Sequence, residues 1–132
     1  MAAVVEILPM TRIYGGAGEE WEQPTDSVVD VSGYTEAAII MVVQSLEVSG
    51  GTVTVHLNTA IDNRGDHYLG LTEIGTWSAN PSDYPVHQYK YLHGSTYGPS
   101  DAPGFARFLR LHAVGTNAGW HITFGVQALM KP

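Results

Sequence analysis

Residues 34–59 constrain the fold most, because they predict two strands joined by a tight turn. Over 52–58 apolar and polar residues alternate, which is the period of a strand with one buried face. The turn is Gly50-Gly51, and glycine alone accepts positive φ freely at both central positions of the turns that suit a hairpin. We therefore predict a β-hairpin in which Val48 lies opposite Val53.

The first strand of this hairpin carries an apolar row on the side that the register turns outward. Ile39, Met41 and Val43 form the row, where a solvated strand should be polar. Soluble monomers seldom leave such a row exposed. Either a second layer of the same chain covers it or another subunit does, so these three residues are candidate interface residues.

The C-terminal third predicts a second hairpin, from strands at 105–114 and 120–130. Apolar residues alternate with polar or small ones along the second of these strands, as in a half-buried strand. The register that follows places Phe108 over Gly125. An aromatic ring in that position covers a glycine that would otherwise weaken the strand.

Short strands, not helices, are predicted elsewhere, because no segment has the 3.6-residue period of an amphipathic helix. The segment 14–24 is glycine-rich and is predicted to be a loop, with Trp21 lying against the fold. At 132 residues the chain suits one domain, over 1–132. We predict an all-β antiparallel sandwich of jelly-roll or immunoglobulin-like topology. The further strands are predicted at 3–8, which Pro9 ends, and at 27–31, 67–71 and 86–92.

The composition argues against several classes of partner. Charged residues make up 14% of the chain, against about 25% in ordinary soluble domains. The formal net charge is −7 and no basic cluster is visible, so we expect no nucleic-acid binding. There is no cysteine, which excludes disulfides and thiolate chemistry. The N-terminus lacks the basic flank of a signal peptide, and no window approaches the roughly 18 apolar residues of a membrane span, so we expect neither export by the usual route nor membrane contact.

Residues that could carry chemistry do not converge in the sequence. The predicted register brings together only His112 and His121, whereas a metal site needs three or four ligands. The turn at 62–67 lacks the spacing of a calcium loop, and its Arg64-Gly65-Asp66 tripeptide, although it matches the integrin-recognition motif, is more typical of an ordinary turn. We expect no enzyme activity, no cofactor and no metal. The acidic residues near the glycine-rich loop have no opposing carboxylate that the sequence can place, and they are Glu19, Glu20, Glu22 and Asp26.

The region 75–104 is the longest stretch predicted to be largely irregular, and we predict that it contacts a partner. Loops of this length in a compact domain are usually functional or interfacial. Tyrosine supplies a large rigid contact area with a hydrogen-bonding tip. The candidate contact residues in this region are Trp77, Tyr84, Tyr89, Tyr91 and Tyr97.

Five short segments carry a resemblance to a known family, and they are VDVSGY at 29–34, TVTVHLNT at 52–59, the turn at 62–68, FLRL at 108–111 and ITFGV at 122–126. Together they resemble the small β-sandwich structural proteins of tailed bacteriophages, some of which decorate the capsid or form head and neck accessories. The resemblance brings no catalytic motif with it.

This resemblance implies a non-enzymatic virion protein, a capsid decoration or cementing subunit that binds neighbouring capsid subunits or other virion proteins. The implied assembly is a homo-oligomer such as a trimer, located in the virion after assembly in the host cytoplasm. The alternative is a carbohydrate-binding module of galactose-binding-like or jelly-roll type, which the FLRL strand also resembles. In that case the tryptophan and tyrosines of 75–104 would stack on sugar rings.

Overall fold

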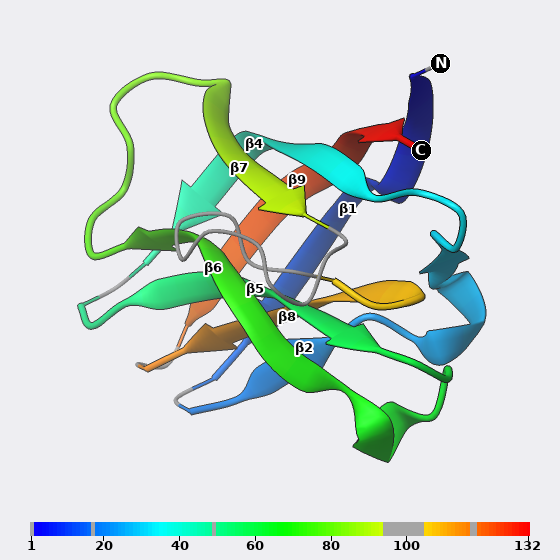
Figure 1. The fold of residues 1–132 in the computed structure, drawn as a ribbon. Coiled ribbons are helices and arrows are strands. Elements are labelled where there is room, and N and C mark those ends of the chain that lie inside the picture. Colours follow the sequence, from blue (N-terminus) through cyan, green and yellow to red (C-terminus); the bar gives the residue numbers. More distant parts are fainter. Residues whose placement is uncertain (1, 17, 49, 94–104, 117–118) are drawn as a thin grey trace.

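The protein is built almost entirely of β-strands in two layers (Figure 1). The computed structural model describes residues 2–16, 18–48, 50–93, 105–116 and 119–132. Within these residues helix is confined to two 3₁₀ turns, η1 (Thr25–Ser27) and η2 (Gly65–His67), and none is long and apolar enough to cross a membrane. The strands are β1 (Ala3–Gly15), β2 (Glu20–Glu22), β3 (Val29–Asp30), β4 (Glu36–Glu47), β5 (Val53–Ala60), β6 (Leu69–Trp77), β7 (Val86–His93), β8 (Phe108–Gly115) and β9 (Trp120–Lys131).

Two antiparallel sheets pack as a sandwich, which confirms the predicted fold class. Sheet A has the strand order β1-β9-β4-β7, and sheet B has the order β2-β8-β5-β6, with β3 also paired to β8. Outward from the β5–β6 connection, the chain pairs β5 with β6, β4 with β7, β2 and β3 with β8, and β1 with β9. The chain is thus one long hairpin that is rolled up, which is the jelly-roll topology and not the immunoglobulin one.

Both predicted hairpins are wrong, because the strands concerned belong to different sheets. β4 lies in sheet A and β5 in sheet B, and β8 and β9 are likewise divided (Figure 1). Gly50 and Gly51 do have positive φ, 73° and 65°, but they turn the chain from one sheet to the other. Phe108 therefore does not lie over Gly125, which pairs instead with Val42 of β4.

Aromatic rings do cover glycines, at other positions than predicted. Trp120 pairs with Gly15, and its indole N–H donates a hydrogen bond of 3.0 Å to the carbonyl oxygen of Gly16. A Cβ on Gly115 would overlap with the Trp120 ring, and one on Gly15 would lie 2.7 Å from it. The two glycines therefore make the space in which this buried tryptophan packs.

A β-bulge in β4 overturns the prediction of an exposed apolar row. Pairing with β9 is regular up to Val43 and shifts before Ser45, so Gln44 is an extra residue that changes the phase of the alternation. The prediction carried the alternation unbroken through Gln44. Sheet B of the same chain covers the row, so of the two stated alternatives the first holds and these residues are core residues. The residues of the predicted row are all fully buried, and they are Ile39, Met41 and Val43.

The N-terminal elements also differ from the prediction. β1 continues past Pro9 as an edge strand, with register shifts on either side of Leu8, and an edge strand at a bulge is where proline is tolerated. The predicted loop contains β2, and the strand predicted at 27–31 is divided between η1 and β3. Trp21 of β2 packs inward as predicted, edge to face with Phe124 at 6.2 Å between ring centroids.

A buried glutamine links the two sheets. The Gln23 side chain is fully buried, and its amide donates to the carbonyl oxygen of Ile7 in β1 at 2.9 Å. Its side-chain oxygen accepts a hydrogen bond from the backbone N–H of Leu111 in β8 at 3.1 Å. Arg110, also buried, donates to the backbone oxygen of Gln23 at 2.6 Å. These bonds join Gln23, the residue after β2, to one strand of each sheet.

Candidate functional site

The outer face of sheet A has an apolar centre, and we call it the sheet A face. Its centre consists of Ala38, Ile40 and Val42 of β4, which are half-buried and alternate with core residues. The two edge strands extend the apolar surface, with 66% of Tyr89 in β7 and 71% of Val4 in β1 exposed. The cross-strand neighbours of the central three are Leu129, Gln127 and Gly125 on β9, and Tyr91, Tyr89 and His87 on β7.

A hollow of about 290 Å³ lies on this face, over the glycine of β9. Gly125 has no side chain to fill the space between β4 and β1. A Cβ there would lie 3.3 Å from the backbone nitrogen of Met10 and 3.4 Å from the carbonyl oxygen of Leu8. The bulged part of β1 therefore approaches Gly125 closely. Ile40 and Val42 line the other side of the hollow, which makes it an apolar depression.

The predicted aromatic contact residues separate into different places. Tyr89 and Tyr91 lie on the sheet A face, and a hydrogen bond to Glu36 raises the pKa of Tyr91. The Tyr84 hydroxyl donates to the carbonyl oxygen of Leu46 at 2.9 Å and accepts from its N–H at 3.1 Å, so this ring anchors its own loop. Trp77 packs partly buried against the core. Tyr97 lies outside the described residues.

Sequence reasoning missed the central residues of the sheet A face. It chose the odd-numbered residues of β4 as the outward row, whereas the outward row is Ala38, Ile40 and Val42. The available signal was that the run from Ala37 to Val43 is apolar at every position. Such a run is typical of a strand that is covered on both faces.

The outer face of sheet B is polar and carries a row of ionisable residues. One cross-strand line runs through Glu22 of β2, His112 of β8, His56 of β5 and Glu73 of β6. The two imidazoles are stacked, with ring centroids 5.6 Å apart and planes inclined by 25°. Burial lowers the pKa of His56 below 6.5, and the neighbouring His112 lowers this pKa further.

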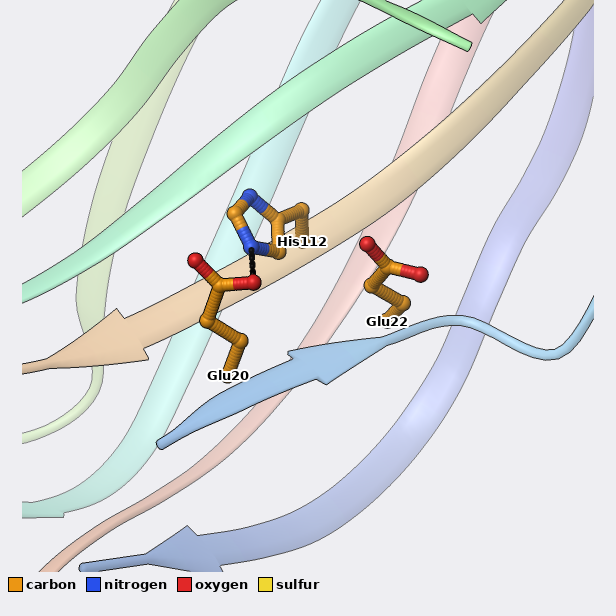
Figure 2. Close-up of side chains that lie close together, drawn as sticks. All are labelled: Glu20, Glu22 and His112. Carbon is orange, nitrogen blue, oxygen red and sulfur yellow. Dashed lines mark ion pairs between the residues drawn. The ribbon is translucent and has the colours of Figure 1, made fainter. Parts of the chain in front are cut away.

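Two carboxylates of β2 face His112, as Figure 2 shows. Nε2 of His112 lies 3.5 Å from a carboxylate oxygen of Glu20. Ligand atoms of Glu20, Glu22 and His112 all lie within 4.8 Å of one another. Arg110 stands beside them, with its guanidinium 3.3 Å from Glu22. The arrangement gathers one imidazole and two carboxylates at one point of the sheet B surface.

The other residues considered for chemistry do not come together. His112 and His121 lie in different sheets, and His121 pairs with Glu47 at 2.9 Å. In the turn at 62–67, Asp62 pairs with His67 at 2.8 Å. The Asn63 amide donates to the carbonyl oxygen of Thr25, so this side chain ties the turn to η1 and does not cap its own backbone. A second hollow, of about 510 Å³, lies beside this turn.

These features define the class of the protein as a jelly-roll sandwich with one apolar and one ionisable outer face. No family model matches the chain, and no curated protein matches it. In fold it is similar to a chain in the structure of infectious bursal disease virus, Gt strain, with a TM-score of 0.57 and 9% identity, covering 99% of this chain and 32% of that chain. The Gx strain structure gives a TM-score of 0.49 and 13% identity over 98% of this chain and 32% of that one. The chain therefore spans about a third of the length of these viral chains. The similarity to the Gt strain chain is one of fold.

Proposed function

We propose that this protein is a non-enzymatic structural subunit of a virion, which binds copies of itself and neighbouring particle subunits through the sheet A face. The observation that carries the proposal is the apolar outer row of Ala38, Ile40 and Val42, flanked by exposed Tyr89 and Tyr91. Contiguous apolar surface of this kind is typical of an interaction site. The jelly roll recurs in viral capsid domains. The fold similarity to a chain of a virus structure supports a place for this protein in a virus particle.

The sheet edges favour association through a face over association through an edge. β1 carries Pro9 and two register shifts, and β6 is paired to β5 with two register shifts. The edge formed by β2 and β3 is divided by η1. In the middle of the edge strand β7, Lys90 is the cross-strand neighbour of the buried Ile39, so it leaves the strand on the inward side, although its side chain is exposed. Bulges, proline and inward-pointing charge are devices that block strand addition at an edge.

The specific role that we propose is a capsid decoration or cementing subunit. Its homo-oligomer, for which we expect a trimer, would bind the particle after assembly in the host cytoplasm and remain in the virion. The low share of charged residues suits a chain that spends its life in contact with other subunits.

The test is the assembly state of the purified protein, followed by binding to capsids stripped of it. Sedimentation should show an oligomer of the 14.2 kDa chain, and Ile40→Lys should weaken self-association and capsid binding at least about tenfold, or about 1.4 kcal/mol. The matched control is Val114→Lys, which places the same charge on the half-buried outer side of β8 in sheet B. A wild-type protein that stays monomeric and does not bind stripped capsids contradicts the proposal, as does equal weakening by both variants.

A carbohydrate-binding module is the second candidate, favoured by one observation. Tyr89 and Tyr91 lie two residues apart on β7 and are 66% and 47% exposed, so both rings are accessible for stacking on sugar. A glycan array that binds the wild type and not Tyr89→Ala would support this function. An array without binding would remove it.

A further inference from the structure

We propose that Glu20, Glu22 and His112 form a binding site for one divalent transition-metal cation of the Zn²⁺ type on the outer face of sheet B. The inference stands independently of the proposed virion role. Figure 2 shows both carboxylates turned towards the imidazole. An imidazole nitrogen with two carboxylate oxygens is a donor set that Zn²⁺ accepts, and a fourth position would stay open to water.

The strand geometry brings the three donors together. Glu20 and Glu22 are two residues apart on β2, so their side chains leave the same face of the sheet. His112 pairs with Glu22 in the β2–β8 register, which places its imidazole beside both carboxylates. Cross-strand neighbours of this kind have Cβ atoms about 4.5–5.5 Å apart. Three donors therefore converge without any change of the backbone.

The distances between donors fit a tetrahedral ion. Zinc–ligand distances of about 2.0–2.2 Å in a tetrahedron put two donor atoms about 3.4 Å apart. Nε2 of His112 and the nearer carboxylate oxygen of Glu20 are separated by 3.5 Å. The largest separation within the three donors is under 4.8 Å, so rotation of the exposed Glu22 side chain completes the site.

The imidazole nitrogen is available for a metal. Nε2 of His112 is buried and, among the residues that the structure describes, has no hydrogen-bond partner. A buried polar atom without a partner is rare in proteins, and water or an ion can supply the partner. Nδ1 of His121 is also unpartnered, so the convergence of three donors, and not the free nitrogen alone, distinguishes His112 among the described residues. The ring is held in place by the stacked His56 and only 17% of its side chain is exposed, so it is oriented before any ion arrives.

The local charge favours a cation over an anion. Two carboxylates outweigh the guanidinium of Arg110, which contacts Glu22 at 3.3 Å and is itself fixed by its bond to Gln23. Glu73 lies one strand beyond His56 and adds negative charge. Ca²⁺ and Mg²⁺ prefer six or more oxygen ligands, so a site with an imidazole and one open position selects a transition metal.

Co²⁺ and Zn²⁺ titrations of the full chain test the site. We expect one equivalent to bind, with the visible absorption of tetrahedral Co²⁺ and, in the NMR spectrum, a shift of the His112 Nε2 resonance on adding Zn²⁺. His112→Ala and Glu20→Gln/Glu22→Gln should each weaken binding more than about 100-fold, because even outer partners of metal ligands change affinity about 10- to 100-fold. The double glutamine variant keeps the size of both side chains at exposed positions, so the protein should stay folded and any loss of metal binding reflects the missing carboxylates.

His121→Ala is the matched control, because His121 also lies beside a single glutamate, Glu47, without a third donor in the described residues. It should bind as the wild type does. The proposal is overturned by a wild type that does not bind millimolar Zn²⁺, by unchanged binding in the double glutamine variant, or by an equal loss in His121→Ala.

Discussion

Replacing Gln23 with methionine tests the buried link between the sheets most directly. Methionine has a similar size and shape, so Gln23→Met removes hydrogen bonds with little change in packing volume. The amide donates to the carbonyl oxygens of Ile7 at 2.9 Å and Ser27 at 3.3 Å, and accepts from the N–H of Leu111 at 3.1 Å. The substitution removes all three bonds while the backbone bonds of residue 23 remain.

The loss should be about 2.5–6.5 kcal/mol in the free energy of unfolding. The carbonyl of Ile7 and the N–H of Leu111 belong to residues that are 1% and 0% exposed, so water cannot replace the amide there. Each buried group left without a partner costs about 1–3 kcal/mol. The longer bond to Ser27 adds about 0.5 kcal/mol, at the lower end of a net hydrogen bond. Against a typical total of 5–15 kcal/mol, the variant should be near the limit of folding.

Equilibrium urea unfolding, followed by tryptophan fluorescence, measures the difference through the transition midpoint at constant slope. The matched control is Gln44→Met, the same change at an exposed position, which should stay within about 0.5 kcal/mol of the wild type. A loss below about 1 kcal/mol in Gln23→Met, or one equal to that of the control, would refute the assignment of the Gln23 amide as the link between the sheets.

Two further predictions concern packing and charge. Gly115→Ala should destabilise the fold by about 1–3 kcal/mol, because its Cβ would overlap with Trp120. The control Gly70→Ala should not, because a Cβ there meets nothing within 4 Å. Equal urea midpoints of the two variants would contradict this prediction. The hydrogen bond from Arg107 holds the pKa of the Asp30 carboxyl well below its ordinary 3.8, so this pair stabilises the fold above that pH and the contribution is lost as the pH falls below it. Asp30→Asn and Arg107→Gln should each flatten the acid limb of stability against pH, the double variant no further, and high salt should reduce the effect because both side chains are exposed. An acid limb unchanged in both single variants would exclude this contribution.

The inward faces of the strands could be predicted from the sequence, but their partners could not. The alternation at 120–128 and 53–57 identifies core residues correctly, because side-chain direction depends only on the strand period. A glycine turn, however, serves a hairpin and a crossing between sheets equally well. The residues between Glu47 and Val53 can span more than the roughly 10 Å that separates packed sheets, so the same turn connects β4 to β5 across the sandwich.

The ionisable cluster could not be placed because β2 was predicted to be a loop. A loop assigns no common direction to Glu20 and Glu22, so the two carboxylates could not be set on one face. The one signal in the sequence was Trp21, an apolar residue between two glutamates, whereas the inward direction of the polar Gln23 could not be read from it. The sequence analysis paired His112 with His121 because it joined β8 and β9 in a hairpin, whereas the two strands lie in different sheets. Strand order, which depends on the whole chain, was the missing information.

The two outer faces differ because of the strands at the centre of each sheet. β4 is apolar from Ala37 to Val43, so one of its faces must be covered by something other than its own core. β5 alternates valine and leucine with threonine, histidine and asparagine, so its outer face is suited to water. Sheet A and sheet B turn these faces in opposite directions (Figure 1). A subunit bound to its neighbours through the sheet A face therefore leaves the outer face of sheet B, with the exposed carboxylates of Glu20 and Glu22, open to solvent.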